Sequence, residues 1–191
     1  MGKGDLRVPQ AATDTQQAAG NATASRHWSP DWDARKAGKD CPHCLMIKDP
    51  DRQSRGLPVF HGDYVTGFLW RGGAIPGYTV AMWNQGHACE PHDLPPADAV
   101  GYWLEVNHLA AAIAAVVDPA KMNYETLGNA VPHLHTHIVP RLQVDPAPHE
   151  PLPGWCFDAD PLSEDLLADT GQQIRHRLTS MGAPPAVRLR S

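Results

Sequence analysis

The sequence has no surplus of basic residues. Its 191 residues include 16 lysines and arginines against 21 aspartates and glutamates, which gives a formal net charge of -5 at pH 7. A chain of this charge has no general attraction for phosphate polymers or anionic membranes, so the composition disfavours a nucleic-acid scaffold. With 42% hydrophobic residues the chain can bury one sizeable core, and we expect one domain.

Long hydrophobic runs are also missing. The first 26 residues contain no apolar stretch typical of a secretory signal, and the longest apolar run, residues 109–117, is too short to cross a bilayer. The four cysteines, of which Cys41 and Cys44 lie close together, suit a reduced compartment and a metal better than a disulfide framework. These features predict a cytoplasmic protein without a membrane partner.

The sequence also lacks the GxxxxGK[ST] pattern that cradles phosphate groups, which excludes a P-loop nucleotide triphosphatase. Histidine, in contrast, is abundant, with eleven in the chain. Imidazoles serve as ligands, nucleophiles and proton carriers near neutral pH. The histidines are therefore the first candidates for functional residues.

Composition divides the chain into a body and two tails. Residues 1–26 have almost no large apolar side chains and cannot bury enough surface to offset the entropy of ordering, so we expect a disordered tail. Residues 27–182 are expected to form the single domain, and residues 183–191 a second tail. Within the domain we distinguish a cysteine knuckle at 41–44, a core at 57–141 and a C-terminal extension at 142–182.

The core combines an antiparallel meander with a long helix. Short β-type runs alternate with turn residues from residue 57 to residue 83. Pro95 and Pro96 can open a helix, in which apolar residues recur at helical spacing as far as Val117.

Two strands and a second helix complete the pattern. One strand is expected at 122–127 and another from His133, and Ser163 is suited to cap a C-terminal helix at 163–178. The segment 27–35, with two tryptophans, is expected to be an irregular lead-in. The predicted class is α+β: a meander sheet, a central helix and a C-terminal helix.

Three histidines alternate with other residues in the stretch VPHLHTHIVPR, residues 131–141. Extended backbone projects alternate side chains to opposite faces, so His133, His135 and His137 should share one face. The outer two would have Cα atoms roughly 13 Å apart, so the three cannot easily share one ion. The spacing favours a division of labour, in which an end histidine serves structure and the middle one acts as a nucleophile toward phosphorus.

Two other interpretations fit the same alternation. The histidines can be partly buried residues without chemistry, although three in register argue against this. Alternatively, His133 and His135 can be a metal-binding pair with a third ligand elsewhere, as in barrel dioxygenases or zinc hydro-lyases. Such a protein would be a metal-dependent oxygenase or lyase, and periodicity alone does not exclude it.

The stretch His-Leu-His-Thr-His-Ile-Val, from His133 to Val139, resembles the signature of the histidine triad (HIT) family, His-x-His-x-His followed by two apolar residues. Pro140 and Arg141 match a common ending of that family, and the order of elements upstream agrees with it. The resemblance covers about residues 41–141. It implies an α+β HIT-like fold, a nucleotide substrate and, because family members usually pair through the central helix and strand, a homodimer.

The resemblance also implies roles for individual residues. His135 would attack the α-phosphate of a nucleotide derivative and form a nucleotidyl-histidine, which water usually resolves. His137 would hydrogen-bond the phosphate oxygens. Asn129 would help to bind phosphate or serve as a plain turn residue. We expect a nucleotide hydrolase or nucleotidyl transferase. The first substrate we expect is a dinucleoside polyphosphate such as diadenosine tetraphosphate. The alternatives are a nucleoside phosphoramidase and a non-catalytic nucleotide-binding protein.

Cys41 and Cys44 can supply two thiolates from a short turn, which is half of a tetrahedral zinc site; the alternative is a pair of free thiols. In zinc-containing histidine triad proteins the set is completed by a histidine after the meander and by the first histidine of the triad. These correspond here to His87 and His133. Four protein ligands leave no open position, so the resemblance implies a structural zinc ion.

Several positions leave the assignment open. The connection 128–132 contains no Gln, Ser or Thr, where many family members have Gly-Gln-Ser/Thr before the triad. Trp70 stands where many members have an acidic residue for ribose hydroxyls. Both departures bear on the substrate class. His43 and Cys89 are close in sequence to the expected zinc ligands and are rival ligands.

Overall fold

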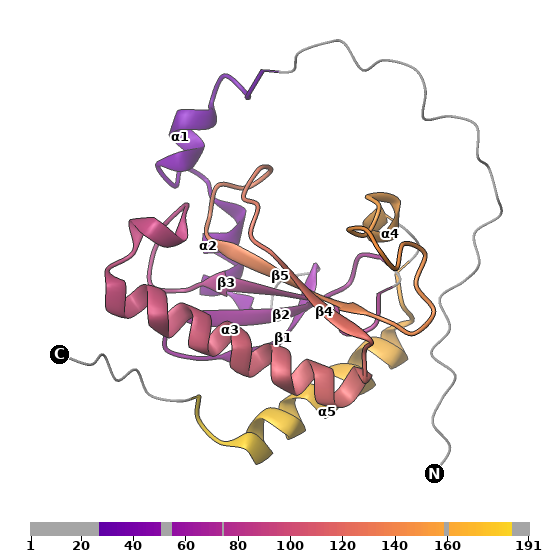
Figure 1. Ribbon diagram of the computed structural model, residues 1–191. Coiled ribbons are helices and arrows are strands. Elements are labelled where there is room, and N and C mark those ends of the chain that lie inside the picture. The colour runs from indigo at the N-terminus through magenta and orange to yellow at the C-terminus, as the bar shows by residue number, and fades with distance from the viewer. Residues whose placement is uncertain (1–26, 51–54, 74, 159–160, 185–191) are drawn as a thin grey trace, which may run out of the picture.

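The computed structural model describes residues 27–50, 55–73, 75–158 and 161–184 (Figure 1). The tail predicted at 1–26 and most of the tail predicted at 183–191 lie outside these ranges. Within the described residues, five strands form one antiparallel sheet in the order β1-β2-β3-β5-β4. The predicted α+β class, with a meander, a central helix and a C-terminal helix, is confirmed.

The meander consists of β1 (Gly56–His61), β2 (Val65–Trp70) and β3 (Thr79–Trp83). β5 (His135–Arg141) pairs with β3, and β4 (Lys121–Glu125) pairs with β5 at the sheet edge. The buried carboxylate of Glu105 holds the first hairpin, since it accepts hydrogen bonds from the backbone N–H groups of Asp63, Tyr64 and Val65 at 2.8, 2.9 and 2.8 Å. A charged acceptor of this kind satisfies three donors that a tight turn leaves open.

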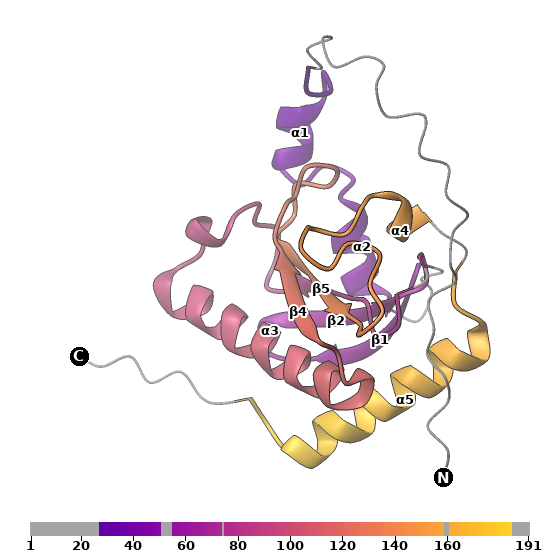
Figure 2. The ribbon, with the colours of Figure 1, turned by 45° about the vertical axis from the view of Figure 1, so that its right-hand side comes forward.

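Two helices cover one face of the sheet, α3 (Pro96–Val117) and α5 (Glu164–Met181), and Figures 1 and 2 show them side by side below it. Glycines allow α3 to approach closely. A Cβ atom at Gly67 would lie 2.5 Å from Leu109 of the helix, and one at Gly101 would lie 2.3 Å from Tyr64. The main hydrophobic core fills the space between these helices and the sheet.

The helix ends follow local signals. Asp118, in the left-handed conformation at φ 53°, ends α3 directly before Pro119. Ser163 caps α5 as predicted, because its hydroxyl accepts a hydrogen bond from the Leu166 N–H at 3.3 Å. Among the described helices, α3 has the length and composition to cross a membrane, with a mean hydropathy of 1.4 over its most apolar window. More than half of that window, 56%, is buried in the structure, and the packing of α3 on the sheet accounts for its apolar composition.

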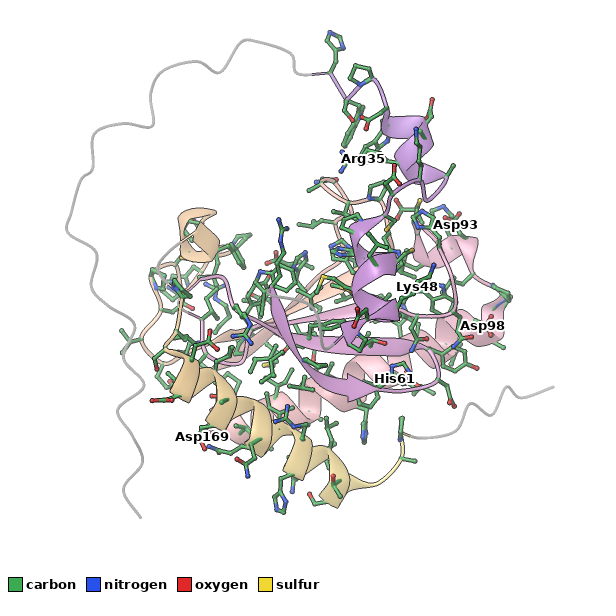
Figure 3. All side chains as sticks on the ribbon, turned by 180° about the vertical axis from the view of Figure 1, so that it is seen from behind. Arg35, Lys48, His61, Asp93, Asp98 and Asp169 are labelled. Carbon is green, nitrogen blue, oxygen red and sulfur yellow. The ribbon has the colours of Figure 1, made fainter. Side chains whose placement is uncertain are left out.

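The opposite face of the sheet carries α2 (Pro42–Lys48), which lies in front of the strands in Figure 3, with α3 behind them. Met46 of α2 packs in a second hydrophobic cluster with Phe68, Val80 and Met82. Pro42 occupies the first helical position, where its missing N–H costs nothing. The two faces of the sheet therefore have separate apolar clusters, a large one under α3 and a small one under α2.

The remaining elements are short. They are α1 (Trp32–Lys36), a 3-10 helix η2 (Pro91–Asp93) and α4 (Trp155–Asp158). The prediction of an irregular lead-in at 27–35 was wrong in part, because α1 forms there. Trp28 stacks on Trp32 with ring centroids 4.5 Å apart, and Arg35 donates to the backbone oxygen of Ala130 at 2.6 Å.

Two predicted strand boundaries differ from the structure. β5 begins at His135 and not at His133, because the N–H of His133 donates to Val131 in a local turn and the N–H of Leu134 donates to Ala88, beyond the end of β3. β4 ends at Glu125, two residues before the predicted end. The extents predicted for the knuckle, the core and the C-terminal extension stay predictions.

Candidate functional site

The alternation of β5 separates its side chains as the sequence predicts. Leu134 and Ile138 belong to the core under α3, and Thr136 exchanges a hydrogen bond with the hydroxyl of Tyr102 of α3 at 2.7 Å. The three histidines point to the other face, toward α2, and their rings form a row. The centroids of His135 and His137 are 4.9 Å apart.

Four predicted metal ligands meet at the beginning of this row. The ligand atoms of Cys41, Cys44, His87 and His133 all lie within 4.8 Å of one another. Cys41 precedes α2 and Cys44 lies in its first turn, so the helix sets their spacing. His87 comes from the loop after β3, and His133 from the residues just before β5. This group could hold a metal ion.

The spacing of the four ligands fits a tetrahedral ion. Cys41 Sγ lies 3.5 Å from His133 Nδ1, Cys44 Sγ lies 3.4 Å from the same atom, and Cys44 Sγ lies 3.6 Å from His87 Nδ1. A tetrahedron with Zn–S bonds of about 2.3 Å and Zn–N bonds of about 2.0 Å has edges of roughly 3.3–3.8 Å. These three of the six separations fall in that range, and all six are within 4.8 Å.

The Nε2 atom of each histidine in the group contacts a backbone carbonyl, which suits metal binding through Nδ1. His133 Nε2 lies 2.9 Å from the backbone oxygen of Trp83, and His87 Nε2 lies 3.0 Å from that of Lys36. An N–H donated to these carbonyls leaves the Nδ1 lone pair free for an ion, as is usual for histidine ligands. Burial, with the neighbouring Cys41, raises the pKa of the Cys44 thiol to about 11, and a bound cation is the group that reverses such a shift.

The rival ligands lie outside this group of four. Cys89 Sγ approaches the carbonyl oxygens of Pro132 and Lys36 at 3.2 and 3.4 Å, on the Nε2 side of His87. His43 turns its ring toward the triad: its centroid is 5.7 Å from that of His133 and 4.6 Å from that of His135. The buried Nδ1 atom of His43 has no hydrogen-bond partner among the described residues.

His135 is held by its own backbone neighbourhood. Its Nδ1 lies 2.5 Å from the backbone oxygen of His133. A carbonyl only accepts, so Nδ1 carries the proton and Nε2 keeps its lone pair. Burial lowers the pKa of His135, which favours the neutral ring. This is the protonation state that a nucleophile requires.

His137 has a partner that the sequence did not reveal. The hydroxyl of Tyr78, a residue that directly precedes β3, lies 2.6 Å from His137 Nδ1, and the two rings stack at 5.8 Å. Burial, followed by the neighbouring His135, lowers the pKa of His137 to about 4. Phe157 of α4 packs edge-on against Tyr78 at 5.3 Å. No motif flagged Tyr78 or Phe157, because each is an ordinary aromatic residue in sequence context.

Two other predicted positions lie apart from the row. Asn129 is exposed, and its side chain forms no hydrogen bond with a described residue. The loop around it is fixed through its neighbour Ala130, which accepts from Arg35. Trp70 is half-buried at the margin of the cluster under α2, on the same face as the histidines.

Comparison with known proteins agrees with this arrangement. Residues 52–144 match the model of the HIT domain. No curated protein matches the chain. Among solved structures, a histidine triad protein from Sinorhizobium meliloti has 24% sequence identity and a TM-score of 0.56, over 70% of this chain and 93% of that one.

Two further structures show the same fold. A hypothetical histidine triad nucleotide-binding protein from Sulfolobus tokodaii has 15% identity and a TM-score of 0.57, over 72% of this chain and 93% of that one. A Zn-bound histidine triad family protein from Mycobacterium smegmatis has 19% identity and a TM-score of 0.56, over 75% and 96%. Residues 52–144 include all five strands and the three alternating histidines, and they form a HIT domain.

Proposed function

We propose that the protein is a nucleotide hydrolase or nucleotidyl transferase that acts at an α-phosphate through a covalent nucleotidyl-histidine on His135. The observation that carries the proposal is the contact between His135 Nδ1 and the His133 carbonyl at 2.5 Å. It leaves the Nε2 lone pair of a neutral ring on the face that the triad shares. The printed name of the Sulfolobus tokodaii protein, nucleotide-binding, supports a nucleotide as the substrate.

The reaction would take place in two displacements. In the first, His135 Nε2 forms a bond to phosphorus while the bond to the leaving oxygen breaks. In the second, the oxygen of water or of another acceptor forms a bond to phosphorus and releases its proton to solvent, while the P–N bond breaks and its electron pair returns to Nε2. Negative charge spreads over the phosphoryl oxygens in each step, and a donor on His137, one ring away at 4.9 Å, is placed to stabilise it.

A dinucleoside polyphosphate is the substrate that we propose first, with a nucleoside phosphoramidate as the alternative. Partly buried apolar side chains gather on the histidine face and offer a surface for a base; they are Ile47, Trp70, Ile75, Leu152 and Phe157. Trp70 stands where many relatives have an acidic residue, so apolar contact would contribute more than ribose recognition.

A structural zinc ion at Cys41, Cys44, His87 and His133 is part of the proposal. The donor set, its spacing and the two carbonyl contacts behind the imidazoles support it. When bound, zinc would supply a closed cross-link between the N-terminal segment and the start of β5, with no role in the displacement. A different function, with His133 and His135 as the ligands of an oxygenase or lyase, has less support, because His135 lies outside the group of four.

A homodimer is also proposed. The outer side of α3 bears an apolar surface with Val100, Trp103 and Leu104, and Val100 is 38% exposed. β4 follows this helix in sequence and lies at the edge of the sheet, where one side of the strand pairs with no other described strand. Light scattering of the purified protein at micromolar concentration would return the mass of two chains if this surface pairs.

Mass spectrometry after brief exposure to a nucleotide panel tests the proposed function. The panel contains diadenosine tetraphosphate, adenosine 5′-phosphoramidate and their guanosine counterparts. We expect an adduct of one nucleoside monophosphate on His135 and none on a His135→Ala variant. An adduct on another residue, or undiminished turnover by the variant, would exclude covalent catalysis by His135. Titration calorimetry that shows binding without turnover would instead identify a non-catalytic nucleotide-binding protein.

A further inference from the structure

The hydrogen bond between Tyr78 and His137 joins the residue directly before β3 to the last histidine of the triad, 59 positions later. We propose that Tyr78 is a positioning residue that sets the tautomer of His137: its hydroxyl donates to Nδ1, so that the proton of the imidazole stays on Nε2. The inference rests on the proposed function, since the Nε2–H group is the donor assigned to the phosphoryl oxygens.

The geometry defines which atoms meet. The Tyr78 oxygen is 2.6 Å from His137 Nδ1, and the two rings are nearly parallel, with an interplanar angle of 19°. Thr79 pairs with Ile138 in the ladder between β3 and β5, which brings the residue before Thr79 alongside this part of β5. Backbone hydrogen bonds of Tyr78 to Trp70 and Ile75, at 2.8 and 3.1 Å, fix the tyrosine itself.

The direction of the hydrogen bond follows from the buried phenol O–H, which must donate and has no partner among the described residues other than His137 Nδ1. Tyr78 is 4% exposed, and burial together with the charge of Glu125 raises the pKa of its phenol, so the hydroxyl keeps its proton. Burial lowers the pKa of His137 to about 4, so the ring is neutral at pH 7. A neutral imidazole has one acceptor and one donor nitrogen. With Nδ1 as the acceptor of the tyrosine proton, Nε2 is the donor.

The two reactive histidines then hold opposite tautomers. His135 carries its proton on Nδ1, because that atom contacts the His133 carbonyl at 2.5 Å, and presents a lone pair at Nε2. His137 accepts at Nδ1 and presents Nε2–H. One ring is thus prepared to attack phosphorus and its neighbour to donate to a phosphoryl oxygen. With the other tautomer, His137 would turn a lone pair toward that oxygen, and the interaction would be repulsive.

The C-terminal extension supports this arrangement from outside the β-strands. Phe157 packs edge-on against the Tyr78 ring at 5.3 Å. The segment that leads to it is anchored by buried Arg141, which donates to both carboxylate oxygens of Asp145 at 2.7 Å. Two aromatic contacts, one with His137 and one with Phe157, hold the phenol in one orientation.

Tyr78→Phe is the test, and Tyr102→Phe is the matched control. Each variant removes one buried hydroxyl next to β5: that of Tyr78 bonds to His137, and that of Tyr102 bonds to Thr136 at 2.7 Å on the opposite face. We expect Tyr78→Phe to lower kcat about 10- to 100-fold, the usual effect of removing a partner that orients a functional imidazole, with little change in KM. We expect Tyr102→Phe to keep the wild-type kcat.

Nitrogen-15 NMR of the histidine rings gives a readout that does not need turnover. In the wild type, His137 should show a protonated Nε2 and an acceptor Nδ1; in Tyr78→Phe the two tautomers should be mixed, and in Tyr102→Phe the wild-type pattern should persist. An unchanged tautomer in Tyr78→Phe would overturn the inference, and so would an equal loss of kcat in both variants. If no nucleotide forms an adduct on His135, the proposed function fails, while the NMR result still decides the role of Tyr78.

Discussion

The two faces of β5, together with the two residues before it, differ in what their side chains are bound to. On the face under α3, Leu134 and Ile138 are buried among apolar neighbours, and the Thr136 hydroxyl has two partners, Tyr102 at 2.7 Å and Thr126 at 2.8 Å. On the face toward α2, the Nε2 atoms of His135 and His137 form no hydrogen bond with a described residue. One strand therefore supplies stability on one side and open chemical groups on the other.

The histidine face is itself divided. At its N-terminal end His133 is completely buried, belongs to the group of potential metal ligands and has both ring nitrogens in contact. His135 and His137, further along, each have Nδ1 in contact and Nε2 open. Substitutions on the α3 face, or at the His133 end of the row, should thus mainly lower stability. Substitutions at His135 or His137 should mainly lower activity.

Loss of the proposed nucleophile should have the largest effect. His135→Ala removes the lone pair that we propose attacks phosphorus, so we expect turnover of a nucleotide substrate to fall at least about 10⁴-fold. The free energy of unfolding should change much less, because no core apolar contact is lost. Steady-state kinetics and urea unfolding of the same preparation measure both. Turnover within tenfold of the wild type would contradict the assignment of His135.

Removal of the metal should have the next largest effect, on stability. If zinc binds the folded state alone, chelation should lower the free energy of unfolding by about 4 kcal/mol relative to zinc present at a thousandfold excess over its dissociation constant. Cys41→Ser should lose metal and stability together.

Cys89→Ser is the control for this experiment, because Cys89 lies next to His87 but outside the group of four. It should keep one zinc per chain by atomic absorption. Loss of the metal from Cys89→Ser, with zinc retained by Cys41→Ser, would mean that the ligand set is wrong. Equal melting temperatures with and without a chelator would show that the ion has no structural role.

A cavity on the α3 face should lower stability and leave the chemistry intact. Ile138→Ala truncates a fully buried side chain, and we expect a cost of about 3 kcal/mol, typical of such a cavity. The variant should unfold at a lower urea concentration than the wild type. In buffer without urea, its kcat should stay within a few-fold of the wild-type value. A kcat as low as that of His135→Ala would mean that the two faces are not independent.

The pH dependence of stability should report the buried imidazole of His137. Its pKa of about 4 in the folded state is below the usual 6.5, so the unfolded chain binds a proton first as the pH falls. Its contribution to stability is therefore complete above pH 6.5 and is lost as the pH falls toward 4. Between pH 7 and pH 5 the loss should be about 2 kcal/mol from this group.

His137→Phe isolates this effect from that of the other histidines. The difference in unfolding free energy between pH 7 and pH 5, measured by chemical denaturation, should be smaller in the variant by that amount. If the unfolding free energy changed equally with pH in the two proteins, His137 would titrate normally in the folded state.

Local patterns predicted much of the fold correctly. The meander, the α3 helix from Pro96 and the cap at Ser163 depend on neighbouring residues, and each is present in the structure. The start of β5 was misplaced by two residues, because a turn between His133 and Val131 competes with the strand ladder, and no local signal distinguishes them. The helix α1 was missed; one contact that joins it to the rest of the domain, from Arg35 to Ala130, spans 95 positions.

The sequence by itself determined that three imidazoles share one face, because side chains in an extended backbone alternate whatever surrounds them. It also limited the metal ligands to a few cysteines and histidines. Only the tertiary structure decided which of these meet, since Cys41 and His133 are 92 positions apart, and that a tyrosine 59 positions upstream reaches His137. Such contacts depend on strand register and helix placement, which are set by the packing of the whole chain.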